Sequence, residues 1–139
     1  TAIIMTFFIF VAMTFGNKEI STFSAIVTGA TIGFLFFNLN PAKVFMGDTG
    51  SLALGGAFCS VAILLKMPLI LIVVAGVCVI EAISVILQVA YFKITKGKRL
   101  FKMAPIHHHL ELCGIKETII VPLFWGITAL LSFLAKNII

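Results

Sequence analysis

Long apolar runs alternate with short polar connections along the whole chain, and this pattern predicts membrane helices packed in a bundle. A helix needs about 20 mainly apolar residues to cross a bilayer, with a lower limit near 17. The predicted fold is therefore all-α, a polytopic transmembrane helical bundle with about five membrane helices in one domain covering residues 1–139. In chain order, the runs are residues 1–15, 20–37, 49–65, 69–92 and 118–136.

Polar and helix-breaking residues separate these runs. Gly16-Asn17-Lys18-Glu19 ends the first run, and Lys66-Met67-Pro68 predicts a tight turn after the third. The longer polar segments are residues 38–51 and 93–117, which we interpret as loops.

Composition agrees with this pattern, since 61% of residues are hydrophobic and only 11% are charged. The net charge of +5 does not indicate nucleic-acid binding, because the basic residues lie in the connections between apolar runs. Three cysteines at these spacings form neither a disulfide framework nor a zinc signature. The composition thus indicates an integral membrane protein whose first partner is the lipid bilayer.

The basic residues also predict the orientation of the bundle. Alternate connections share one side of the membrane, so segments 38–51 and 93–117 lie on the same side. By the positive-inside rule, the more basic side faces the cytoplasm. Seven basic residues fall on that side (Lys43, Lys93, Lys96, Lys98, Arg99, Lys102, Lys116) and three on the other (Lys18, Lys66, Lys136).

The chain opens with Thr1 inside an apolar run that is already under way. No basic leader or small-residue cleavage site precedes that run, so it does not read as a cleavable signal peptide. We therefore expect a fragment of a longer protein.

Residues 38–51 contain Asp48, the only aspartate of the chain. Pro41 makes a continuous helix through this segment unfavourable, and Gly47 and Gly50 allow close approach of the backbone. Residues such as Asp48 often open a helix. The segment therefore predicts a loop that ends in a helix N-terminus, where free N–H groups attract phosphate and a carboxylate can hold Mg²⁺.

Asp48 also has a plainer interpretation, as a helix N-cap without catalytic duty. One carboxylate does not build a magnesium site alone, because Mg²⁺ takes octahedral oxygen ligands from carboxylates, water and substrate phosphates. We expect any further carboxylates to come from outside this chain, and we expect the isolated 139 residues to be inactive.

His107, His108 and His109 follow Pro105 in the second polar segment. Consecutive side chains on a helix point about 100° apart, so three histidines on a helix do not converge on one metal. In a turn or extended segment, one or two can face a phosphate while the third packs or caps. The alternative is solvated loop polarity. For the basic residues of 93–102, the main interpretation is topology and binding of anionic headgroups.

Three further residues stand out, and two of them, Gln88 and Phe45, are candidates for the site. Glu81 and Gln88 lie seven residues apart on one face of the fourth run, where a buried acid is costly and is usually paired or functional. Gln88 is nearer the cytoplasmic end, whereas Glu81 is deeper and is expected to hydrogen-bond a neighbouring helix. Phe45, three residues before Asp48, can present its ring to a nucleobase.

Two motifs carry a resemblance to a known family. The segment from Asn38 to Gly56 (NLNPAKVFMGDTGSLALGG) and the segment from Met103 to Glu111 (MAPIHHHLE) closely resemble bacterial phospho-N-acetylmuramoyl-pentapeptide transferases, the MraY type. The segment from Glu81 to Val89 is also similar. The resemblance implies the C-terminal half of a ten-helix, multi-pass protein of the bacterial cytoplasmic membrane.

The resemblance also implies an activity and its partners. The family transfers phospho-MurNAc-pentapeptide from UDP-MurNAc-pentapeptide to undecaprenyl phosphate, which gives lipid I and UMP for peptidoglycan synthesis and so serves cell shape and division. Asp48 would bind Mg²⁺, Phe45 would stack on the uracil, and Asn38 and Gln88 would lie near the nucleoside. The histidines, His107 and His108 above all, would lie beside the phosphates. A homodimer is one candidate assembly.

Two alternatives stay open. One is a related enzyme that transfers GlcNAc-1-phosphate from UDP-GlcNAc to a polyprenyl phosphate; the histidine segment favours the muramoyl enzyme. The other is a non-catalytic subunit or transporter segment in which Asp48 and Glu81 line an ion path.

Overall fold

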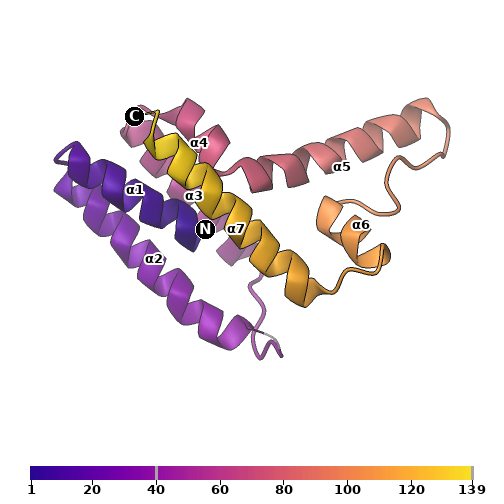
Figure 1. Cartoon of the computed structure of the whole chain (residues 1–139), viewed down its shortest axis with the longest axis horizontal. Helices are drawn as coiled ribbons and strands as arrows, with labels where there is room; N and C mark the ends of the chain where they lie inside the picture. Colours follow the sequence, from indigo (N-terminus) through magenta and orange to yellow (C-terminus); the bar gives the residue numbers. More distant parts are fainter. Residues whose placement is uncertain (40, 139) are drawn as a thin grey trace. The chain divides into compact units, whose positions relative to one another are not determined.

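The computed structural model describes residues 1–39 and 41–138, and the elements in this part of the chain are α-helices (Figure 1). The predicted all-α fold is thus confirmed. In chain order, the helices are α1 (Ala2–Thr14), α2 (Lys18–Asn38), α3 (Asp48–Leu64), α4 (Pro68–Val74), α5 (Gly76–Ile94), α6 (Ile106–Leu112) and α7 (Glu117–Lys136).

Among the described residues, α2, α5 and α7 are long and apolar enough to cross a membrane. Helices α1 and α3 are apolar but shorter, with 13 and 17 residues. Many large apolar side chains point outward, and Phe36 and Leu52 are about three-quarters exposed. Outward-facing apolar side chains over so much of the surface suit lipid rather than water, and the chain is a membrane protein.

The chain divides into two compact units. The first contains residues 1–74 and 129–139, and the second contains residues 75–128. Helix α7 contributes its first part to the second unit and its last part to the first.

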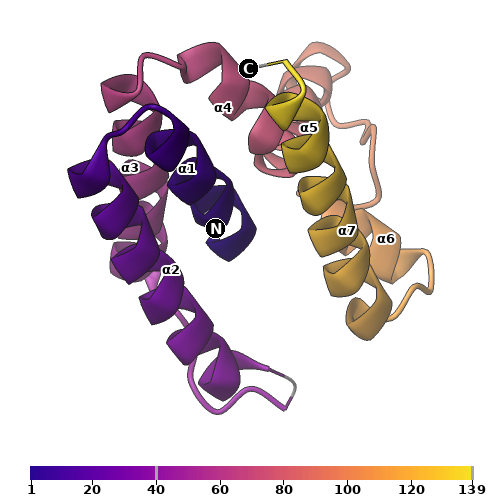
Figure 2. The ribbon, with the colours of Figure 1, turned by 60° about the vertical axis from the view of Figure 1, so that its left-hand side comes forward.

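A hairpin of α1 and α2 forms the centre of the first unit, and Figures 1 and 2 both show the two helices side by side. Gly16, in the connection, has φ +72°, a conformation that favours glycine. The hairpin buries Ile4, Met5 and Phe8 of α1 and Ser24 of α2. Helix α3 contacts both helices, and α4 contacts α3. The contact between α2 and α3 holds the two helices that flank the Asp48 loop.

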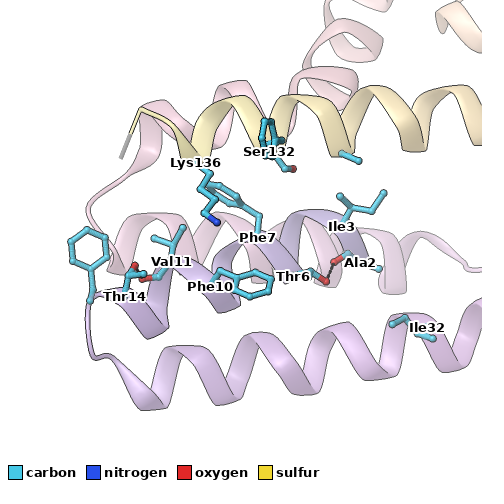
Figure 3. Close-up of a pocket in the computed structure, with 13 residues that line it drawn as sticks. Ala2, Ile3, Thr6, Phe7, Phe10, Val11, Thr14, Ile32, Ser132 and Lys136 are labelled. Atoms are coloured by element: carbon cyan, nitrogen blue, oxygen red, sulfur yellow. Dashed lines mark hydrogen bonds between the residues drawn. The ribbon is translucent and has the colours of Figure 1, made fainter.

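An open pocket of about 760 Å³ also lies in the first unit, between α1, α2 and the end of α7. Figure 3 shows that Phe7, Phe10 and Val11 line it from α1, with Ile32 from α2 and Lys136 from α7. Its lining includes no aspartate, glutamate or histidine. The pocket is an apolar space between membrane helices and contains none of the predicted site residues.

The fourth apolar run differs from the prediction, because it is broken into α4 and α5 at Ala75. Gly76, a poor helix former, begins the second piece. Hydropathy stays high on both sides of the break, so the apolar pattern alone does not reveal it. The break coincides with the boundary between the two units.

The second polar segment also differs from the loop that we predicted, because residues 106–112 form the short helix α6. Pro105 precedes the helix as its N-cap residue, and Gly114 follows it with φ +94°. Proline before a helix and a left-handed glycine after it are ordinary helix boundaries. Helix α6 contacts α5, and it carries all three histidines.

Candidate functional site

Asp48 is the first residue of α3, as the sequence predicts. The N-cap residue is Gly47, in an extended conformation with φ −76° and ψ 177°, and no side chain caps the helix. The first backbone N–H groups of a helix have no acceptor inside it, and they carry a partial positive charge. Asp48 thus lies where a helix end favours anions, and it is not the N-cap residue of the plainer interpretation.

The Asp48 carboxylate is exposed and makes no hydrogen bond or ion pair with any residue in the described ranges 1–39 and 41–138. Only the backbone carbonyl of Asp48 is engaged, as acceptor for the Ser51 hydroxyl at 3.0 Å. A carboxylate that the fold does not use is available for a ligand.

The loop before Asp48 is held by backbone and amide contacts. The Asn38 side-chain amide donates to the Val44 carbonyl at 2.8 Å, and the Lys43 N–H donates to the Phe37 carbonyl at 2.9 Å. The side-chain NH₂ group of Asn38 therefore holds the start of the loop against residue 44. Asn40, in the same segment, lies outside the described residues.

Phe45 follows this closure, and its side chain is 81% exposed. The ring is thus presented to its surroundings from a loop whose base is tied down. Such a ring is suited to stacking on a planar ligand. Gly50 allows Met46 to lie against the first turn of α3, since a Cβ there would come within 2.8 Å of the Met46 Cγ.

In the second unit, His107 contacts an acid from another helix. Its Nδ1 lies 2.9 Å from Oε2 of Glu81 on α5, and the side chains are 37% and 19% exposed. Glu81 does hydrogen-bond a neighbouring helix, as expected, but the partner is a residue of the histidine triplet. We did not expect Glu81 in the site, although an acid in an apolar helix signals that a partner exists.

The other two histidines point to different partners. His108 Nδ1 lies 2.8 Å from Glu111 Oε2 on the same helix. His109 Nδ1 accepts the backbone N–H of Lys102 at 3.2 Å, and its ring packs edge-on against Phe101 at 5.6 Å. The three rings therefore do not converge on one point, in line with the argument from helix geometry.

Gln88 is fully engaged with the polypeptide. Its Oε1 accepts the N–H groups of Leu100 at 3.1 Å and Phe101 at 2.8 Å, and its Nε2 donates to the Phe101 carbonyl at 3.0 Å. These three bonds tie the segment after α5 back to that helix, so Gln88 acts here as a clamp on the loop that leads to α6.

No group of three or more histidine, cysteine, aspartate or glutamate residues that could hold a metal occurs in the described part of the chain. The free carboxylate of Asp48 fits Mg²⁺ as a single ligand, because this ion commonly takes one or two carboxylates and completes its shell with water and phosphate oxygens. The residues present thus suit a shared site and not a metal cage.

Asp48, Phe45 and Asn38 belong to the first unit, whereas Gln88 and the three histidines belong to the second. Within each unit, the structure brings the candidate residues of that unit onto one segment or onto contacting segments. The meeting of Asp48 with the histidines around one ligand stays a prediction.

Comparison with known proteins gives two kinds of match. Residues 1–66 match the sequence model of the family described as Glycosyl transferase family 4. The chain is 60% identical over 135 residues to phospho-N-acetylmuramoyl-pentapeptide-transferase of Acetivibrio thermocellus. The matched region covers 96% of this chain and 41% of the relative.

Proteins of the same name from Clostridium botulinum and Alkaliphilus metalliredigens are 53% and 55% identical. Those matches cover 96% and 94% of this chain, and 41% and 39% of the relatives. The resemblance inferred from the motifs is thus confirmed, and the chain spans about two-fifths of the length of these curated relatives.

Proposed function

We propose that this chain, which is similar over 96% of its length to phospho-N-acetylmuramoyl-pentapeptide-transferases, is part of an enzyme with that activity. The reaction transfers phospho-MurNAc-pentapeptide from UDP-MurNAc-pentapeptide to undecaprenyl phosphate and releases UMP. Its product, lipid I, enters peptidoglycan synthesis. The single observation that carries the proposal is the 53–60% identity to proteins of this name over nearly the whole chain.

The geometry of the Asp48 segment supports phosphoryl transfer. This chemistry depends mainly on positioning and on stabilising the charge of the transferring group. Asp48 combines a free carboxylate with the N-terminus of a 17-residue helix, a combination that can hold a diphosphate together with its cation. Asp48 would hold Mg²⁺, which neutralises charge on the diphosphate, and other ligands would come from the phosphates, water and residues outside this chain.

The remaining candidates have distinct roles in the proposal. Phe45 stacks on the uracil, and Asn38 shapes the loop that presents Phe45. His107 and His108 contact phosphate oxygens, and His109 packs inside the histidine segment. Gln88 serves the nucleoside region by holding residues 100 and 101 in place.

The position in the cell follows from charge and hydropathy. We place the protein in the bacterial cytoplasmic membrane, with residues 38–51 and 93–117 on the cytoplasmic face, because that side carries seven of the ten basic residues. A soluble UDP-linked donor and a lipid acceptor can meet at that surface. A homodimer stays a candidate assembly.

Exchange of radiolabelled UMP by the full-length protein tests the activity. We expect exchange with UDP-MurNAc-pentapeptide and undecaprenyl phosphate, and none with UDP-GlcNAc. Exchange only with UDP-GlcNAc would favour the GlcNAc-1-phosphate transferase alternative. We also expect no turnover by the isolated 139 residues, and lipid I synthesis by them would refute the need for ligands from outside.

A further inference from the structure

Glu81 is the only acidic residue of α5, a helix that is apolar enough to cross a membrane. Its side chain is 19% exposed, and one carboxylate oxygen, Oε1, is buried without a hydrogen-bond partner in the described part of the chain. Placing an acid in such a helix is costly, and acids that persist there are usually paired or functional. We therefore expect Glu81 to have a role beyond packing.

The partner of the other Glu81 carboxylate oxygen, Oε2, indicates that role. Oε2 lies 2.9 Å from Nδ1 of His107, which is 26 residues further along the chain. A carboxylate oxygen accepts hydrogen bonds and does not donate them. An ionised Glu81 therefore requires a proton on the facing nitrogen, Nδ1, and the contact fixes the direction of the His107 ring.

The second ring nitrogen of His107 is left available. Nε2 makes no hydrogen bond with the described residues, and the side chain is 37% exposed. By contrast, His109 is held through both nitrogens, by the Lys102 N–H at Nδ1 and by the Cys113 sulfur, 3.8 Å from Nε2. His107 alone combines a partner from another helix with an open ring nitrogen.

We propose that Glu81 is a positioning residue for His107, and that its carboxylate fixes the Nδ1–H tautomer so that Nε2 faces the reacting phosphates. The inference rests on the proposed function for the role of those phosphates. The contact itself is a property of the second unit alone. The competing explanation is that Glu81 only pins α6 to α5.

The test uses the full-length protein with three substitutions. Glu81→Leu removes the acceptor, Glu81→Gln keeps an acceptor oxygen without the charge, and Glu117→Gln is the matched control. Glu117 is an exposed glutamate of the same unit. Groups that orient a functional histidine typically contribute about 10- to 100-fold. We expect a loss of that size in kcat for Glu81→Leu, a smaller loss for Glu81→Gln and none for the control.

A spectroscopic readout separates positioning from pinning. Nitrogen-15 NMR of histidine-labelled protein reports which ring nitrogen carries the proton. We expect the Nδ1–H form of His107 in the wild type and in Glu117→Gln, and a shift towards the Nε2–H form in Glu81→Leu. Glu81→Gln should give a mixture, because an amide can both donate and accept. This variant carries the test if Glu81→Leu does not fold.

The outcomes are distinct. A wild-type protein that makes no lipid I would refute the proposed function, and the NMR result would still decide whether Glu81 selects the tautomer. An active wild type with unchanged kcat and tautomer in both Glu81 variants would overturn the inference. A lower thermal midpoint, with unchanged kcat per folded molecule, would show that Glu81 only pins the helices.

Discussion

The Asp48 segment (residues 38–51) and the histidine segment (α5, α6 and the residues between them) differ in how their candidate side chains are held. In the first, two of the three side chains expected to meet ligand are free, because the Asp48 carboxylate has no partner in the described residues and Phe45 is 81% exposed. Only Asn38 is engaged, by its hydrogen bond to the Val44 carbonyl. In the second, each expected side chain already has a partner, since Gln88 makes three hydrogen bonds and every histidine makes at least one contact. One region is built for binding, and the other is built for orientation.

This difference leads to different mutational signatures. Substitutions of Asp48 and Phe45 should reduce activity and leave stability unchanged. Substitutions in the histidine segment should change stability, ring orientation or both.

Asp48→Asn should have the largest effect. The change removes the negative charge and keeps the shape, and no contact in the described part of the chain is lost. Loss of one charge-stabilising group commonly costs about 10²–10³-fold in kcat, and loss of the cation as well should bring activity near zero. UMP exchange measures the loss, and the thermal midpoint should not move. Retained transferase activity would support the transporter or non-catalytic alternative.

Gln88→Leu should lower both stability and activity. It removes three hydrogen bonds and leaves the N–H groups of Leu100 and Phe101 without their acceptor. With about 1 kcal/mol net for each bond, we expect a clear fall in the thermal midpoint and faster proteolysis near Lys98 and Arg99.

Gln88→Glu is the matched control, because it keeps an oxygen that accepts those two N–H groups and replaces the donor to the Phe101 carbonyl with a second oxygen. The clamp predicts a smaller effect for this variant. A raised KM for the UDP donor with unchanged stability would instead show that Gln88 contacts the nucleoside directly.

Phe45→Leu should raise the KM for the UDP donor and leave the thermal midpoint unchanged. Stacking of a base on an aromatic ring contributes about 1–3 kcal/mol, so we expect a rise of roughly tenfold. Phe45→Tyr keeps a ring and serves as the control. Equal effects of the two substitutions would argue against stacking.

Glu111→Gln should have the smallest effect. The His108–Glu111 pair joins residues three apart on one helix, and both side chains are more than one-third exposed. Exposed pairs contribute about 0–1 kcal/mol, so kcat should change by only a fewfold. A loss as large as that expected for Glu81→Leu would show that orientation of His108, rather than of His107, dominates.

The sequence predicted much of this fold because hydropathy reports membrane helices directly. The run predicted at 49–65 is the helix Asp48–Leu64 in the structure, and the run predicted at 118–136 is the helix Glu117–Lys136. The break at Ala75 was missed because both sides are equally apolar, and only Gly76 marked it. Helix α6 was missed because the polar composition of 93–117 hid its boundary residues, Pro105 and Gly114.

The candidate site divides in the same way. The position of Asp48 at a helix start depends on neighbours in sequence, so local patterns were sufficient to predict it. The contact between Glu81 and His107 and the clamp from Gln88 join residues 26 and 13 positions apart. The first depends on the packing of α6 on α5, the second on the return of residues 100 and 101 to α5, and no local pattern encodes either.

The prediction from the sequence to be tested is that Asp48 and the histidines serve one phosphate site in the full-length protein. Mn²⁺ can replace Mg²⁺ and broadens the NMR signals of nearby nuclei, so it reports this proximity in the full-length, histidine-labelled protein. With UDP present, we predict saturable broadening of the His107 and His108 ring signals, and its loss in Asp48→Asn. Unbroadened histidine signals, or broadening that persists in Asp48→Asn, would contradict the account.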